Sequence, residues 1–284
     1  MAVVEVGGVQ YHIENRLKKA WDRIKDGKLK KADDDRVYVV DGRERSGKSV
    51  FALQQSAYID PSIIHNTERI CFNAEEFLKA IRETESSTHE TKVIIFDEAF
   101  RGLSSRGAIS KTNKVIIQAL MEMGQKNLVV FIVLPSFFML DSYPAILRSH
   151  SLIHIWKERF TKRRGFKVYN YQKKAKLYDI GMKKGWGYKF PTYLKGRFSS
   201  KYPGGSEFEA LYRDKKRKSL ETMDIEDKKQ VDRKAELRKE VLKTLKEQGT
   251  LKKAEKSLKD RGIWVSHMTI SRIANDNAVE ALIA

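Results

Sequence analysis

The chain has 284 residues, 41% of them apolar, which suffices for one sizeable core with a smaller module and excludes a chain disordered throughout. Its formal net charge of +19 favours a polyanionic partner over a small neutral ligand. No apolar run is long enough to span a bilayer, the N-terminus lacks signal-peptide features, and the single cysteine, Cys71, excludes an internal disulfide, so we expect a cytoplasmic protein without an integral membrane segment.

The first predicted segment, residues 1–35, is an N-terminal hairpin and helix extension. Apolar residues from Ile13 to Ile24 recur at helical spacing, which predicts an amphipathic helix over 11–30. A charged turn, "KKADDD", then leads into the next segment.

Residues 36–157 alternate apolar strand-like runs with helical patterns. The predicted helices lie near 49–58, 74–83, 113–123 and 139–147. The predicted strands are "VYVV", "RICF", "KVIIF", "NLVVFIVL" and "SLIHIW". Such alternation is typical of an α/β fold, with a mainly parallel sheet covered by helices on both faces.

The rest of the chain divides into three further segments. Residues 158–205 are basic and aromatic, and we expect a β-rich extension of short strands and turns. Residues 206–248 form a charged helical linker, and 249–284 a small helical domain.

The stretch "GRERSGKS" follows the first strand of the α/β segment and precedes a helix, as a phosphate-binding loop requires. Backbone N–H groups of such a loop surround phosphate oxygens, and the helix N-terminus adds partial positive charge. Lys48 would reach the β- and γ-phosphates, and the Ser49 hydroxyl would bind Mg²⁺. The predicted nucleotide-binding residues are Gly42, Arg45, Ser46, Gly47, Lys48, Ser49 and Val50.

An acidic pair ends the strand "KVIIF". Asp97 at the strand tip can hold Mg²⁺, and Glu98 can polarise a water molecule for attack on the γ-phosphate. An acidic pair alone often caps a helix, but downstream of a phosphate loop it indicates nucleotide hydrolysis. We therefore predict ATP and Mg²⁺ as cofactors and Glu98 and Lys48 as catalytic residues.

These two motifs, Walker A "GRERSGKS" and Walker B "VIIFDE", resemble the additional-strand, catalytic-glutamate class of P-loop NTPases, which have a RecA-like fold. In that class a further strand lies between the two Walker strands, and "NLVVFIVL" is the candidate here. The following segment resembles FtsK/HerA-type DNA-pumping ATPases and zonula occludens toxin-like phage ATPases. The resemblance implies that Ser136 is the polar sensor of the γ-phosphate, a position at which many relatives have Gln or Thr. It also implies that Arg148 is the arginine that ends the helix before the next strand.

The arginine of such ATPases commonly completes a neighbouring subunit's site, which would give Arg148 a catalytic role in trans. The alternative is an arginine favoured at a helix C-terminus by the helix dipole. Arg101 and Arg106, in the loop after the second Walker motif, are competing candidates, and that loop could equally face DNA.

Most of the net positive charge lies in one segment, since Lys157 to Lys201 contain fifteen Lys and Arg against two acidic residues, which gives 15 − 2 = +13 of the total of +19. Cationic side chains neutralise phosphates, so we predict nucleic-acid contacts there. Interleaved aromatic residues could stack on bases, although packing within a small sheet is the favoured interpretation. The residues predicted to make these contacts are Arg163, Arg164, Lys173 and Lys174.

The C-terminal segment resembles a helix-turn-helix domain. Leu251, Ala254 and Leu258 form one helix face, Ser266 caps a second helix, and Met268, Ile270 and Ile273 mark its apolar side. The alternative is a helical bundle used for oligomerisation. The residues predicted to face the DNA major groove are His267, Thr269, Ser271 and Arg272.

Two functions follow as hypotheses. The first is an ATP-hydrolysing DNA motor of a virus or mobile element, a homo-oligomer acting on double-stranded DNA, for which a hexameric ring is one arrangement. The second is a nucleotide-gated DNA-binding adaptor or regulator with slow turnover. A phage morphogenesis ATPase acting at a membrane is a third, weaker hypothesis.

Overall fold

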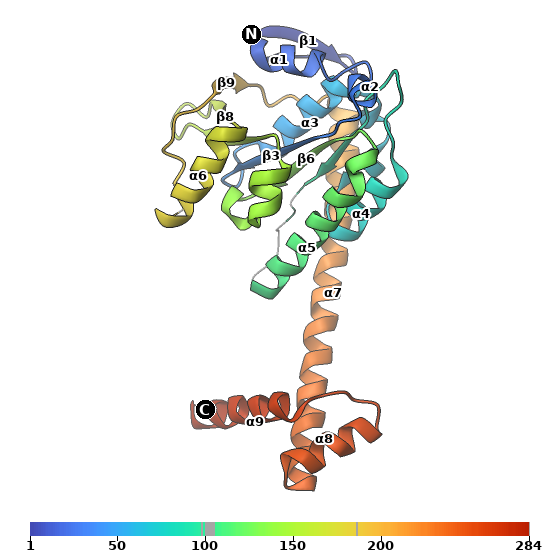
Figure 1. Cartoon of the computed structure of the whole chain (residues 1–284), viewed down its shortest axis with the longest axis vertical. Helices are drawn as coiled ribbons and strands as arrows, with labels where there is room; N and C mark the ends of the chain where they lie inside the picture. The colour runs from blue at the N-terminus through green and yellow to red at the C-terminus, as the bar shows by residue number, and fades with distance from the viewer. Residues whose placement is uncertain (98, 100–105, 186, 284) are drawn as a thin grey trace. The chain divides into compact units, whose positions relative to one another are not determined.

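The computed structural model describes residues 1–97, 99, 106–185 and 187–283, with side chains for all of these except 106–108, 220, 223–231 and 277–283 (Figure 1). The chain divides into two compact units, Met1–Ser219 and Leu220–Ala284. The division falls inside the helix Gly205–Gln248, and the domain boundary after residue 248 stays a prediction.

The N-terminal segment begins with a hairpin and continues with two short helices. Its elements are β1 (Ala2–Val6), β2 (Val9–Ile13), α1 (Asn15–Asp22) and α2 (Lys28–Ala32). The prediction of one helix over 11–30 is wrong at its start, because Val9, Tyr11 and Ile13 alternate with strand period and β2 pairs antiparallel with β1. Trp21 of α1 is buried, as the helical spacing predicts.

A seven-stranded sheet forms the centre of the first unit. Its strands are β3 (Arg36–Gly42), β4 (Ile70–Cys71), β5 (Val93–Phe96), β6 (Val129–Leu134), β7 (Ser151–Lys157), β8 (Arg164–Asn170) and β9 (Leu194–Phe198). They are ordered β4-β5-β6-β3-β7-β8-β9, and the first five are parallel. The five strands predicted in this segment are confirmed, and β6 lies between β3 and β5 as expected.

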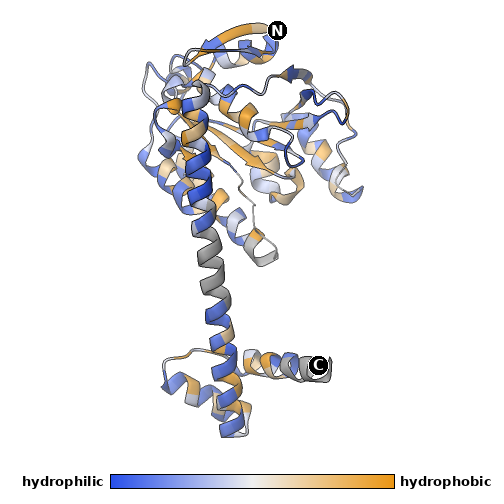
Figure 2. Cartoon of the chain, turned by 180° about the vertical axis from the view of Figure 1, so that it is seen from behind, coloured by the Kyte–Doolittle hydropathy of each residue, from blue (hydrophilic) through white to orange (hydrophobic). Residues whose placement is uncertain are grey.

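Helices cover both faces of this sheet. The α-helices are α3 (Lys48–Ile59), α4 (Ala74–Glu83), α5 (Arg106–Glu122), α6 (Tyr171–Lys183) and α7 (Gly205–Gln248). One apolar cluster packs α3, the N-terminal segment and the start of α7 on one face, and another packs α4, α5 and α6 on the other. The strands between these layers are apolar on both faces, as Figure 2 shows by colour.

Short helices connect the larger elements. The 3₁₀ helices are η1 (Pro61–Ile64), η2 (Thr67–Arg69), η3 (Met123–Gln125) and η4 (Phe137–Met139), and η5 (Tyr143–Arg148) is a π-helix. The helix predicted near 139–147 is therefore shorter and divided between η4 and η5.

The basic segment continues the sheet. β8 pairs antiparallel with β7, and β9 pairs antiparallel with β8. The prediction of strands and turns alone is wrong over α6, whose Leu177 and Gly181 are buried at helical spacing against the sheet. The favoured interpretation of the aromatic residues as packing residues is confirmed for Tyr169 and Phe198, which are buried.

The second unit has a small core of its own. Helices α8 (Leu251–Asp260) and α9 (His267–Ile283) pack with the C-terminal part of α7 around Val241, Ala254, Leu258 and Ile270. The prediction for Met268 is wrong, since its side chain is 73% exposed. Among the described residues, no helix is both long and apolar enough to cross a membrane.

Candidate functional site

The loop from Gly42 to Ser49 turns sharply from β3 into α3. Gly47 directly precedes the helix at φ 102°, in the left-handed region that favours glycine. Gly42 has φ 144°, and a Cβ there would lie 2.2 Å from the carbonyl oxygen of Ile155. Strand β7 therefore leaves no space for a side chain at this position. Both glycines are therefore required by the loop's conformation.

Polar groups of the loop lie around the N-terminus of α3. Lys48 Nζ donates to the carbonyl oxygens of Gly42 at 2.8 Å and Arg43 at 3.1 Å, which places the ammonium against the loop backbone. The buried hydroxyl of Ser46 has no hydrogen-bond partner among the described residues. Arg45 has a left-handed backbone, and Val50 is buried in the first turn of α3.

The hydroxyl group and the carboxylate that are predicted to hold a metal ion lie next to each other. Ser49 Oγ donates to Asp97 Oδ1 at 3.1 Å, although the two residues are 48 positions apart in the chain. Asp97 is 1% exposed, and its backbone N–H donates to the carbonyl oxygen of Cys71 in β4. Glu98, the predicted base, lies outside the described residues.

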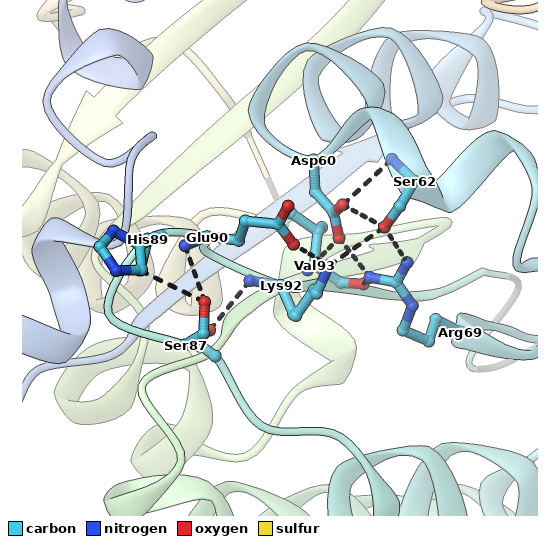
Figure 3. Close-up of polar contacts among 9 residues, drawn as sticks. Asp60, Ser62, Arg69, Ser87, His89, Glu90, Lys92 and Val93 are labelled. Atoms are coloured by element: carbon cyan, nitrogen blue, oxygen red, sulfur yellow. Dashed lines mark hydrogen bonds and ion pairs between the residues drawn. The ribbon is translucent and has the colours of Figure 1, made fainter.

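A buried polar cluster holds the start of β5, the strand that carries Asp97 at its end (Figure 3). The Asp60 carboxylate pairs with Arg69, with both side chains under 10% exposed, and accepts the backbone N–H of Val93 at 3.0 Å. Arg69 also donates to the carbonyl oxygen of Val93 and to Ser62 Oγ. The charged groups are thus satisfied, and both backbone groups of the first strand residue are fixed.

Asp97 has further contacts that the sequence did not predict. Its Oδ2 atom accepts a hydrogen bond from the hydroxyl of Tyr212 and lies 3.7 Å from Lys216 Nζ, both from α7. Burial, and then the Asp97 carboxylate, raises the pKa of the Tyr212 phenol well above its usual value, so this hydroxyl is a donor at neutral pH.

Ser136, the predicted sensor, lies after β6 and takes part in a network beneath the loop. Its hydroxyl is 3.3 Å from the Tyr188 hydroxyl, which donates to the buried carboxylate of Asp41. Asp41 also accepts from the backbone N–H of Phe137 and faces His154 Nδ1 at 2.9 Å. Ser136 is therefore connected to the residue that precedes Gly42.

Arg148 lies at the other end of the sheet from the loop. Its guanidinium forms a two-pronged pair with Asp35, next to the start of β3, and its Nε donates to the carbonyl oxygen of Leu120 at 3.1 Å. β3 separates this pair from Gly42 by about 20 Å, at roughly 3.3 Å per residue. Within one chain Arg148 therefore stabilises the fold, and contact with a neighbouring subunit stays a prediction.

Arg164, for which contact with nucleic acid stays a prediction, lies beside the loop. A Cβ at Gly47 would be 3.0 Å from Arg164 Cδ and 3.2 Å from its Nε. The guanidinium makes no ion pair with any residue that the structure describes. Nothing in the sequence pattern indicated this position, because Arg164 is one of fifteen basic residues in its segment.

The other basic residues predicted to contact nucleic acid differ in exposure. Arg163 is exposed in the turn between β7 and β8, which also contains Phe160, a residue that is 87% exposed. Lys173 donates to the carbonyl oxygen of Thr192. The prediction for Lys174 does not fit this structure, because its side chain is fully buried and donates to two carbonyl oxygens of η5, and burial lowers its pKa to about 8.

Strands β8 and β9, the last two in the order of the sheet, carry further basic residues on one face. Lys167 and Lys195 lie directly opposite each other, and Arg197 lies two residues further along the same face. None of the three pairs with an acidic group among the described residues. Like charges opposite each other destabilise a sheet, so an anionic partner would relieve this repulsion.

In the second unit, His267 and Arg272 of α9 are exposed, and Thr269 and Ser271 are half-buried. Ser266 Oγ accepts the backbone N–H of Thr269 at 3.4 Å, in the position predicted for the helix cap. His267 Nδ1 lies 3.4 Å from a carboxylate oxygen of Glu255. All four predicted residues therefore lie in the first two turns of one helix.

No protein-family model and no curated protein matches the sequence. Among solved structures, the DNA-packaging ATPase B204 from Sulfolobus Turreted Icosahedral Virus is 12% identical, over 48% of this chain and 93% of its own, with a TM-score of 0.30. The genome-packaging NTPase B204 from Sulfolobus turreted icosahedral virus 2, in complex with AMP, is 13% identical over 49% of this chain and 94% of its own, with a TM-score of 0.29. The N-terminal domain of zonular occludens toxin from Neisseria meningitidis is 13% identical over 48% and 84%, with a TM-score of 0.26. At these values the likenesses establish neither family membership nor function.

Proposed function

We propose that this protein is an ATPase of the additional-strand, catalytic-glutamate class of P-loop NTPases that uses Mg·ATP to act on DNA. The observation that carries the proposal is the contact between Ser49 Oγ and Asp97 Oδ1 at 3.1 Å, beside a loop with the sequence GRERSGKS. The phosphate loop follows β3 and the acidic motif follows β5, and each predicts one half of a nucleotide site. The two halves are in contact although β6 lies between β3 and β5 in the sheet.

The residues present fit Mg·ATP. A hydroxyl and a carboxylate oxygen are ligands that Mg²⁺ prefers, and Mg²⁺ is usually held by few protein groups together with phosphates. The loop supplies backbone N–H groups, the N-terminus of α3 and the Lys48 ammonium for the phosphates. The unpartnered hydroxyl of Ser46 is a further donor within this loop.

Hydrolysis would join a water oxygen to the γ-phosphorus and break its bond to the oxygen that bridges the β- and γ-phosphates. Glu98 is proposed to accept the proton of the attacking water. Lys48 would hold the β- and γ-phosphate oxygens, and Ser49 and Asp97 would hold the metal ion, which when bound neutralises charge on the phosphates.

Two surfaces support DNA as the substrate. The first is the face of β8 and β9 with Lys167, Lys195 and Arg197, together with Arg163 in the turn before β8. The second is the start of α9, where Arg272 is exposed on a helix preceded by a turn and a second helix. We propose double-stranded DNA, because a recognition helix of this kind enters a major groove.

A nucleotide-gated adaptor with slow turnover is the second candidate. The observation that favours it is the contact of Asp97 with Tyr212 and Lys216, since it ties the metal site to a helix that continues to Gln248. A switch needs such a connection whether or not turnover is fast.

Hydrolysis of Mg·ATP by the full chain, measured with and without duplex DNA, tests the proposal. For a motor we expect strong stimulation by DNA and displacement of a protein block bound to the duplex. Slow turnover that DNA does not change supports the adaptor. Absence of Mg·ATP binding at saturating concentration would contradict both functions.

Arg164 and its neighbour Arg163 allow a paired prediction. We expect Arg164→Ala to raise the Kd for ATP by about tenfold, the usual effect of losing one charge-assisted hydrogen bond, and to leave DNA affinity unchanged. Arg163→Ala should instead weaken DNA binding and leave the Kd for ATP unchanged. Fluorescence titrations with a labelled nucleotide and a labelled duplex measure both effects, and equal effects of the two variants would contradict this assignment.

A further inference from the structure

The two carboxylate oxygens of Asp97 have different partners. Oδ1 accepts from Ser49, which belongs to the proposed metal site, whereas Oδ2 faces Tyr212 and Lys216 of α7. The Asp97 side chain is 2% exposed, and that of Lys216 is 21% exposed. The charge of the carboxylate is thus compensated by groups of α7.

The charge of Lys216 has a consequence for metal binding. A buried carboxylate without a partner is strongly unfavourable, so an ammonium group 3.7 Å away stabilises Asp97 when no cation is bound. A divalent cation held by Ser49 and Asp97 would lie close to that ammonium, and like charges so close repel each other. Mg²⁺ and Lys216 therefore compete for one carboxylate.

Tyr212 favours binding of the metal ion, whereas Lys216 opposes it. Its phenol is 3% exposed and packs against Phe72 with ring centroids 5.6 Å apart, so its hydroxyl has a fixed position. By donating to Oδ2 it holds the Asp97 carboxylate in the orientation in which Oδ1 meets Ser49. It is a positioning residue for the metal site.

We propose that the start of α7 senses occupancy of the metal site, with Tyr212 positioning Asp97 and Lys216 neutralising it until Mg²⁺ and nucleotide bind. The inference rests on the proposed function. Lys215 anchors the same helix turn independently, because its Nζ donates to the carbonyl oxygens of Thr67 at 2.7 Å and Ile70 at 2.8 Å. Loading of the site would then change the contact of Lys216 while Lys215 keeps the helix in place.

Titration of Mg²⁺ into the full chain with a fluorescent ATP analogue tests the proposal. The quantity measured is the Mg²⁺ concentration at half-maximal nucleotide binding. We expect Lys216→Met to lower it by about fivefold, because a partly exposed charge pair is modest in strength. Tyr212→Phe, which keeps the ring, should raise it by about fivefold, as loss of one hydrogen bond to a carboxylate does.

Lys218→Met, at a lysine of α7 whose side chain is 70% exposed, is the matched control, and we expect it to leave the midpoint unchanged. Binding of the analogue in EDTA should be the same in all variants, since only the metal site is altered. An unchanged or raised midpoint in Lys216→Met, or an equal shift in Lys218→Met, overturns the inference while the proposed function stands. Wild-type binding that is absent or independent of Mg²⁺ overturns the proposed metal site and the inference together.

Discussion

Replacing Lys48 with alanine should weaken binding of Mg·ATP by about 100-fold or more, because the ammonium would make charge-assisted hydrogen bonds to two phosphate groups. In the structure Lys48 Nζ lies against the carbonyl oxygens of Gly42 and Arg43, so it is already held at the loop. Alanine removes the charge and keeps the helix propensity of the first turn of α3. Isothermal titration with a slowly hydrolysed ATP analogue measures the loss directly.

Two comparison variants make this result specific. Glu98→Gln should keep the affinity for ATP and reduce hydrolysis by about 10²- to 10⁴-fold, as loss of a general base does. Lys79→Ala, at a lysine of α4 that is 71% exposed, should change neither quantity. Unchanged ATP affinity in Lys48→Ala would remove the loop from the proposed mechanism, and wild-type turnover in Glu98→Gln would remove Glu98.

Local patterns predicted the part of the site that depends on consecutive residues. A phosphate loop, a strand with an acidic end and the apolar strands between them can be read within about ten residues each, because strand and loop conformations depend on local periodicity and glycine placement. The position of β6 between β3 and β5 also followed from the resemblance.

The contacts with Asp97 could not be predicted in this way. Tyr212 is 115 residues further along the chain than Asp97, on a helix whose sequence carries no motif. Only the packing of α7 against Ile70 of β4 and the neighbouring Phe72 brings the two together. The same reason applies to Arg164, whose position beside Gly47 depends on the antiparallel pairing of β8 with β7.

Counts of charge also did not reveal where charged side chains lie. Lys174 is one of the basic residues that made its segment a nucleic-acid candidate, yet it is buried and donates to two carbonyl oxygens of η5. Arg148 similarly pairs with Asp35. Both side chains donate hydrogen bonds to groups within the fold, because buried carbonyl and carboxylate oxygens need donors. A count of charges along the sequence does not show which basic residues serve this purpose.

The second large effect is expected from the C-terminal unit. Removal of residues 249–284 should lower the affinity for duplex DNA by about 100-fold or more, within the range that separates specific from non-specific binding. Basal ATP hydrolysis should stay within about twofold, because the described groups proposed to bind nucleotide belong to Met1–Ser219, a compact unit in which α8 and α9 take no part. Electrophoretic mobility shifts and a hydrolysis assay on the same preparation measure both quantities.

Truncation also exposes Val241 of α7, so a point variant is needed to separate DNA contact from folding. Arg272→Ala should weaken duplex binding by about tenfold and lower its dependence on salt, since one phosphate or base contact is lost. Lys253→Ala, at an exposed lysine of α8, is the matched control and should have a smaller effect. Equal effects of the two would indicate general electrostatic attraction, whereas full DNA affinity after truncation would place recognition on the β8–β9 face, where Lys167 and Lys195 lie opposite each other.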